Sequence, residues 1–193
     1  NRRSRVDYRR TIRRWIRVIF WAALLSWGLC SIAFADHAKH PPLVVSTCQV
    51  RALHSPHGGS ASALVRLLGR AKKTVHVAIY GLTHPALVTA LIDAQKRGAL
   101  VIVKADKVQS AGKAQKAMIA KLRDAGVTVE VSEQSRLLHH KFGVVAGRWV
   151  ATGSFNWTVS AENRNRENLV VLDCPEVARQ FIEEWGFVQP KEP

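Results

Sequence analysis

Residues 138–157 read LHHKFGVVAGRWVATGSFNW and predict two short strands joined by a tight turn. Both flanks, residues 142–145 and 149–152, are apolar and rich in β-branched side chains, as strands prefer. Gly147 and Arg148 stand between them, and glycine at the first central position favours a two-residue type II′ turn. The stretch therefore predicts a β-hairpin.

A two-residue turn sets the register of this hairpin, with Lys141 opposite Ser154 and His139 opposite Asn156. Side chains alternate between the two faces of a strand, so His139 and Lys141 point the same way. The hairpin would gather an imidazole, an ammonium, a hydroxyl and an amide at one end of a sheet. This set suits a phosphoryl group, because lysine and the neutral donors bind its oxygens. Histidine can attack phosphorus or protonate a leaving oxygen near neutral pH.

The same residues resemble the signature of the phospholipase D superfamily. The match consists of His139, one residue and Lys141, followed later by Gly153-Ser154, one residue and Asn156. The chain is most similar to the branch of small bacterial endonucleases that carry one copy of the motif. The similarity covers roughly residues 43–188, including Trp157 and the segments 160–163, 166–168 and 169–172.

The resemblance implies a homodimer in which two copies of His139 face each other across a shared groove. One His139 attacks phosphorus and forms a phosphohistidine, while its partner protonates the leaving alkoxide and later activates water. Lys141 and Asn156 hold the non-bridging oxygens, and Ser154 orients that network. Glu167, by resemblance, accepts a hydrogen bond from the far imidazole nitrogen and fixes its tautomer.

Three residues around the motif have more than one interpretation. The superfamily usually has Asp five residues after its lysine, where this chain has Ala146. An Asp there would brace the turn, and the alternative is a site that has decayed into a binding pocket. His140 points away from His139 and is expected to be either an ordinary half-buried histidine or a peripheral contact to the substrate backbone. Trp157 either stacks on a base near the groove or packs in the core.

Strands and helices alternate along the rest of the chain. Strands are expected over residues 43–53, 74–80, 100–105, 127–131 and 167–172, and helices over residues 60–73, 85–97, 111–125 and 175–185. This order predicts an α/β fold, with a mixed β-sheet covered by helices on both faces, as in the phospholipase D-like α-β-α sandwich. Residues 43–188 form one catalytic domain, preceded by a linker (36–42) and followed by a short tail (189–193).

The first 35 residues have the composition of a targeting segment. Residues 1–17 hold eight Arg and one Asp, and residues 18–35 contain no charge and end Ala33-Phe34-Ala35. This pattern predicts a secretory signal peptide cleaved after Ala35, and hence a periplasmic or secreted bacterial protein. An uncleaved membrane anchor is the alternative, because eighteen apolar residues can just span a bilayer.

Charge, cysteine and histidine content limit the possible binding partners and cofactors. The net charge is +15, of which residues 1–17 contribute seven, leaving +8 from residue 36 onward. Such a chain favours a polyanion, either nucleic acid or an anionic lipid surface. Cys48 and Cys174 either form a disulfide or remain two separate buried thiols. The histidines outside the motif lack a cysteine or carboxylate at a familiar ligand spacing, so neither a metal nor another cofactor is expected.

Three functions fit these observations. The first is a metal-independent endonuclease that cuts DNA or RNA with little sequence preference through backbone contacts. The second is a lipid phosphodiesterase acting on phospholipid head groups, which should show an apolar rim or an interfacial helix. The third is a nucleic-acid-binding protein with a decayed site.

Overall fold

The computed structural model of the chain describes residues 47–132 and 136–188. The chain divides into two units, residues 1–42 and 43–193. The expected signal peptide (1–35), linker (36–42) and tail (189–193) lie outside the described residues. Among the residues described, every helix is too short or too polar to span a lipid bilayer.

The described residues form seven strands and six helices. The strands are β1 (Gln49–Ser55), β2 (Thr74–Ile79), β3 (Leu100–Asp106), β4 (Thr128–Ser132), β5 (Lys141–Val145), β6 (Trp149–Gly153) and β7 (Glu167–Asp173). The helices are α2 (Ser60–Leu68), α3 (Pro85–Lys96), α4 (Lys107–Ala111), α5 (Lys113–Asp124), α6 (Val159–Asn163) and α7 (Pro175–Phe187). All elements expected from the sequence are present, and α4 and α6 are additional short helices.

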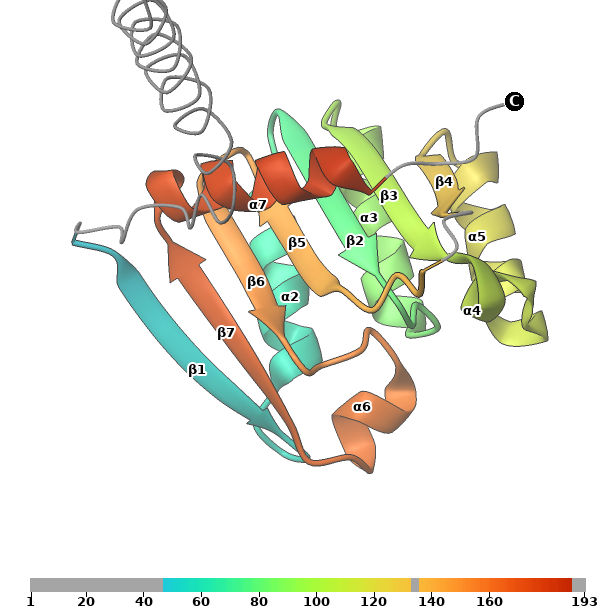
Figure 1. Cartoon of the computed structure of the whole chain (residues 1–193), viewed down its shortest axis with the longest axis horizontal. Helices are drawn as coiled ribbons and strands as arrows, with labels where there is room; N and C mark the ends of the chain where they lie inside the picture. Colours follow the sequence, from blue (N-terminus) through green and yellow to red (C-terminus); the bar gives the residue numbers. More distant parts are fainter. Residues whose placement is uncertain (1–46, 133–135, 189–193) are drawn as a thin grey trace, which may run out of the picture. The chain divides into compact units, whose positions relative to one another are not determined.

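The strands make one mixed sheet in the order β1-β7-β6-β5-β2-β3-β4. β2, β3 and β4 are parallel, and the remaining neighbours pair antiparallel. Helix α7 crosses one face of the sheet, and α2, α3 and α5 lie behind the other (Figure 1). The expected fold class, a mixed sheet covered by helices on both faces, is confirmed.

Each face of the sheet buries its own apolar layer. Alternation along β2 directs Val75, Val77 and Ile79 into the layer shared with α2, α3 and α5, and Ala78 into the layer under α7. Phe142 of β5 packs edge-on against Phe181 of α7, with ring centroids 5.0 Å apart. Because both faces are covered, the central strands are nearly all apolar.

The hairpin between β5 and β6 has a three-residue turn, so the expected two-residue turn is wrong. Val145 pairs with Trp149, and Phe142 pairs with Thr152, one residue away from the expected register. Ala146 and Gly147 both adopt left-handed backbone conformations, with φ of 54° and 63°. The amide of Ala146 donates to the carbonyl of Thr74 (2.8 Å), because pairing with β2 continues one residue past β5.

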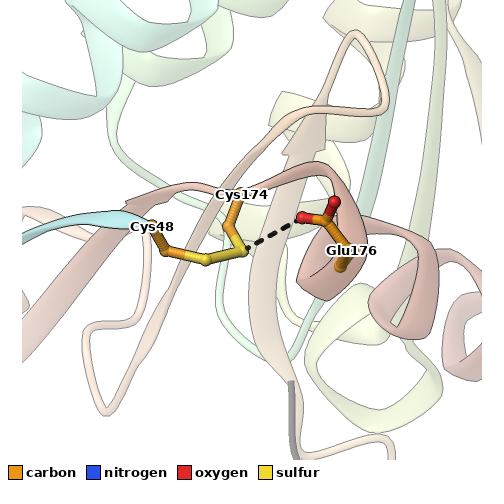
Figure 2. Close-up of side chains that lie close together, drawn as sticks. All are labelled: Cys48, Cys174 and Glu176. Atoms are coloured by element: carbon orange, nitrogen blue, oxygen red, sulfur yellow. Dashed lines mark hydrogen bonds between the residues drawn. A yellow bond between two sulfur atoms is a disulfide. The ribbon is translucent and has the colours of Figure 1, made fainter. Parts of the chain in front are cut away.

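Cys48 and Cys174 form a disulfide across 126 residues of sequence, with Cα atoms 5.0 Å apart. Figure 2 shows the bond between the residue before β1 and the residue before α7, with Glu176 beside it. The sulfurs are bonded to each other, so this group offers no thiolate pair to a metal ion. The bridge fastens the edge strand β1 to the start of α7 and constrains the unfolded chain.

Candidate active site

The predicted phosphoryl-binding residues come together at one end of the sheet. Lys141 opens β5, Ser154 directly follows β6, and Glu167 opens β7. The three strands are antiparallel neighbours, so these termini lie at the same end, beside α6 in Figure 1. The motif residues lie at the same end even though the expected turn length was wrong. An antiparallel hairpin brings its two outer ends together whatever the length of its turn.

The side chain of Lys141 is largely buried. Its side chain is 9% exposed, and its Nζ donates a 2.6 Å hydrogen bond to the backbone carbonyl of His139. Burial lowers the pKa of Lys141 below its usual value, while the nearby Glu167 carboxylate acts in the opposite direction. A poorly solvated ammonium binds an anionic phosphoryl oxygen more strongly than a fully hydrated one would.

His139 presents its imidazole to the surface. Its ring packs against the ring of Tyr80, with centroids 4.7 Å apart, and no hydrogen bond holds its ring nitrogens within the described part of the chain. His140 points to the other face, where it hydrogen-bonds Glu184 of α7 at 2.9 Å and contacts the ring of Phe142. The expected opposition of the two histidines is confirmed, and of the two only His139 lies on the face of Lys141.

Tyr80 belongs to a network that the sequence did not reveal. Its hydroxyl accepts a hydrogen bond from Gln109 (2.8 Å), and Gln109 lies on the unexpected helix α4. Asp106 caps that helix by accepting from the Gln109 amide (2.8 Å), and its second oxygen accepts from the amide of Leu138 (3.3 Å). A closed ring of contacts therefore fixes both the backbone next to His139 and the aromatic surface under its imidazole.

Asn156 has a fixed amide orientation. Its Oδ1 accepts a 3.1 Å hydrogen bond from the backbone amide of Gly81, so its NH₂ group remains as a donor. A Cβ atom at Gly81 would lie 3.1 Å from that oxygen and 3.2 Å from Thr158 Cγ2, which explains why glycine stands there. The NH₂ group is thus the part of this side chain that can donate to an anionic ligand.

Ser154 and Glu167 are hydrogen-bonded to each other. The hydroxyl of Ser154 donates to Glu167 Oε2 (2.5 Å) and accepts from the amide of Asn168 (3.0 Å), while Asn165 donates to Glu167 Oε1 (2.9 Å). Both carboxylate oxygens are therefore engaged, and the expected hydrogen bond between Glu167 and His139 is absent from the described residues. Within one chain Glu167 orients Ser154 instead.

Trp157 is a core residue, so its assignment to substrate binding is corrected. Its side chain is 1% exposed, and a Cβ atom on Gly143 would lie 3.2 Å from its ring. The ring fills the space that Gly143 leaves on the sheet and is closed to a nucleic-acid base.

Ala146, where the superfamily usually has Asp, lies in the turn at the far end of β5 from His139. The two positions are seven residues apart, and the five residues of β5 between them span about 16 Å. An Asp at this position would therefore sit in the turn and not at the phosphoryl-binding end. The departure from the motif leaves His139, Lys141, Ser154 and Asn156 in place.

Comparison with known proteins places the chain among relatives of this fold. The family described as "Cardiolipin synthase, PLD-like domain" matches residues 64–186. The chain is 38% identical over 131 residues to the mitochondrial cardiolipin hydrolase of Xenopus tropicalis, covering 67% of this chain and 61% of that protein. It is 30% identical over 141 residues to a phospholipase D of Rickettsia typhi, covering 73% and 66%. The chain thus spans less than two thirds of the length of these curated relatives.

Comparison with solved structures shows the same fold. Nuc from Salmonella typhimurium, a phospholipase D family member, superposes with a TM-score of 0.71 at 28% identity, covering 76% of this chain and 99% of Nuc. NucT from Helicobacter pylori superposes with a TM-score of 0.66 at 18% identity, covering 73% and 95%, and at that identity shows the shared fold.

Proposed function

Because the chain belongs to the PLD-like family, we propose that it is a metal-independent phosphodiesterase that cuts DNA or RNA with little sequence preference. The observation that carries the proposal is that the imidazole of His139 and the ammonium of Lys141 both lie against the ring of Tyr80, while Asn156 binds the next residue, Gly81. The Nuc-like branch is favoured because the structural match covers 99% of Nuc.

The reaction proceeds in two displacements at phosphorus within a homodimer. A ring nitrogen of one His139 attacks, a P–N bond forms, and the P–O bond to the leaving group breaks. The His139 of the partner subunit gives its proton to the departing alkoxide and then takes a proton from water. That water attacks phosphorus, the P–N bond breaks, and a phosphate monoester leaves with His139 restored.

The other polar residues bind and orient. Lys141 neutralises a non-bridging oxygen, and the NH₂ group of Asn156 donates to another as negative charge builds in the transition state. The hydrogen bond between Ser154 and Glu167 fixes the end of β6 against the start of β7. Tyr80 holds the imidazole plane, so the attacking nitrogen needs little reorientation.

Hydrolysis of phospholipid head groups is a second candidate with support of its own. The curated relatives are named cardiolipin hydrolase and phospholipase D. Three exposed aliphatic side chains also lie on segments bordering the site, namely Val108 (66%), Leu137 (57%) and Val159 (46%). Such a rim can enter a lipid surface or be covered by a second subunit. We favour nucleic acid because of the net charge of +8 after residue 35 and the match to Nuc.

For location, we propose export by residues 1–35 to the periplasm or the medium, with an uncleaved anchor as the alternative. Fractionation of cells with sequencing of the mature N-terminus distinguishes the two. A mature chain that begins near Asp36 supports cleavage, and an intact N-terminus in the membrane fraction contradicts it.

One assay separates the candidate functions. The purified chain, in EDTA, is offered plasmid DNA, RNA and phospholipid vesicles in separate reactions, with the His139→Ala variant as control. Cutting of nucleic acid that falls at least about 10³-fold in the variant supports the proposal. Head-group release alone establishes the lipid function, and binding without turnover establishes a decayed site.

A further inference from the structure

A second charged feature lies at the end of the sheet opposite His139. A pocket of about 270 Å³ opens between α2 and the β1, β7 and β6 strands. Its lining includes Arg51 of β1, Arg66 of α2 and Arg70, which follows α2, together with Trp149 and Asp173. None of these residues takes part in the proposed chemistry, so the pocket needs a separate explanation.

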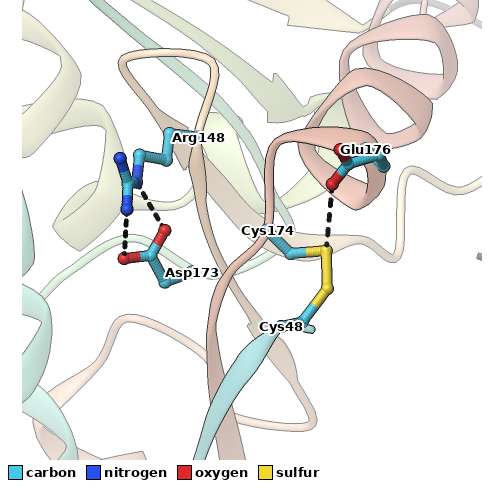
Figure 3. Close-up of polar contacts among 5 residues, drawn as sticks. All are labelled: Cys48, Arg148, Asp173, Cys174 and Glu176. Atoms are coloured by element: carbon cyan, nitrogen blue, oxygen red, sulfur yellow. Dashed lines mark hydrogen bonds and ion pairs between the residues drawn. A yellow bond between two sulfur atoms is a disulfide. The ribbon is translucent and has the colours of Figure 1, made fainter. Parts of the chain in front are cut away.

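The charge in this pocket is not balanced. Its one carboxylate, Asp173, is held by a fourth arginine, Arg148, through Nε to Oδ1 (2.5 Å) and Nη2 to Oδ2 (3.1 Å), as Figure 3 shows. Arg51 and Arg66 form no salt bridge with a carboxylate in the part of the chain that the structure describes. Three guanidinium groups therefore line a concavity whose only acid is already paired.

One of the three arginines is also partly fixed in place. The guanidinium of Arg70 lies 5.6 Å from the centroid of the Trp149 ring, and Arg148, already paired with Asp173, lies 5.2 Å from the same ring. Stacking on an aromatic ring limits the motion of the Arg70 side chain without using its N–H donors. A planar fork matches the oxygens of a phosphate, so the pocket has the chemistry of a phosphodiester-binding site.

We propose that this pocket binds a backbone phosphate of the nucleic-acid substrate, remote from the phosphate that is cut. The inference rests on the proposed nuclease function and adds a second contact to it. Strand β7 runs from Glu167 at the catalytic end to Asp173 at the pocket, a span of about 20 Å. That span corresponds to about six base pairs of duplex. A polymer can reach both places, whereas one lipid head group cannot.

The test compares matched charge variants on substrates of increasing length. Arg51→Gln with Arg66→Gln removes two charges from the pocket, and Lys121→Gln with Arg179→Gln removes two exposed charges elsewhere as control. Both sets are also made with His139→Ala, so that binding is measured without cutting. Hairpin duplexes extend from shorter than about six base pairs to several times that length. Bis(4-nitrophenyl) phosphate reports the chemistry alone.

We expect the pocket variant to lose affinity for long duplexes on the order of tenfold, with a salt dependence shallower by about one to two phosphate contacts. Affinity for the shortest duplex and hydrolysis of the small diester should remain those of the wild type. The control variant should show no length-dependent loss.

Three results would overturn the pocket assignment: equal losses at every length, no loss at any length, or a loss of binding to anionic vesicles with duplex binding unchanged. The last would assign the pocket to a membrane surface. The two proposals fail separately. A wild-type chain that cuts DNA while the pocket variant binds it normally refutes only the pocket, and length-dependent binding without any cutting refutes only the nuclease.

Discussion

At the proposed catalytic end of the sheet, His139 contacts an aromatic ring and Lys141 a backbone carbonyl, and neither forms a salt bridge within the described residues. At the opposite end, Arg148 and Asp173 bind each other directly, and the Cys48–Cys174 disulfide closes the chain beside them (Figure 3). Groups that satisfy one another have little capacity left for a ligand, whereas groups held by neutral partners keep theirs. The difference gives a structural role to the Arg148–Asp173 pair and the disulfide, and a chemical role to the proposed catalytic end. The unpaired arginines of the neighbouring pocket are the exception at the structural end.

The strongest way to break this division is to remove the disulfide. Cys48→Ser with Cys174→Ser should lower the free energy of unfolding by about 3–5 kcal/mol, because the bridge closes a long loop in the unfolded chain. Urea denaturation measures the loss. Turnover at a temperature where the variant is folded should match that of the wild type, and a fall in kcat there would show that the two ends are coupled.

Substitution of Tyr80, at the proposed catalytic end, should change turnover and not stability. Tyr80→Leu removes the surface against which His139 rests, so kcat should fall about 10–100-fold with little change in KM. Tyr80→Phe keeps the ring and loses only the hydrogen bond from Gln109, so it should retain most of the activity. Thermal unfolding of both variants provides the control. If Tyr80→Leu is as active as Tyr80→Phe, the ring does not position the histidine.

The lowered pKa of Lys141 predicts a pH dependence at the proposed catalytic end. Burial lowers its pKa below 10.5, so the ammonium loses its proton, and the site its cation, at a lower pH than an exposed lysine would. The general-acid histidine also controls kcat/KM, so the effect of Lys141 is measured as binding of a short hairpin duplex in the His139→Ala background. Affinity should fall with rising pH at a pH below 10.5. Lys141→Arg in the same background keeps its charge through this range, so its affinity should persist to higher pH. A fall at the same pH in both variants would belong to another group.

The smallest effect is expected at Ala146, in the turn at the closed end. Asp tolerates the left-handed conformation better than alanine and can hydrogen-bond its own backbone. Ala146→Asp should therefore raise the free energy of unfolding by about 0.5–1 kcal/mol and leave kcat unchanged. Denaturation and steady-state kinetics measure the two quantities. A large gain in kcat would mean that the Asp of the superfamily motif serves catalysis and not the turn.

The elements and the gathering of the motif could be predicted because they depend on local pattern. Residues 142–145 and 149–152 are apolar and rich in β-branched side chains, and antiparallel pairing then brings Lys141 and Ser154 to one end. The turn length could not be predicted, because alanine gives no signal of a left-handed conformation.

Other features depend on contacts between distant segments. Helices α4 and α6 have five residues each, too few to show a helical period, so the link from Gln109 to Tyr80 had no signature. Whether Trp157 is buried depends on the missing side chain of Gly143, on another strand. The engagement of Glu167 by Asn165 follows from the loop before β7, whose path residue spacing does not define.

The proposed mechanism passes through a covalent bond between a ring nitrogen of His139 and phosphorus. Its most direct test is to quench the reaction of ³²P-labelled DNA within one turnover and to map the label by peptide mass spectrometry, with His139→Ala alongside. We predict an acid-labile, base-stable phosphoramidate on His139, with the phosphorus still esterified to one DNA fragment, that disappears on further incubation as product accumulates, and none in the variant. Turnover by the variant at the wild-type rate, or a label found only on another residue, would contradict the proposed mechanism.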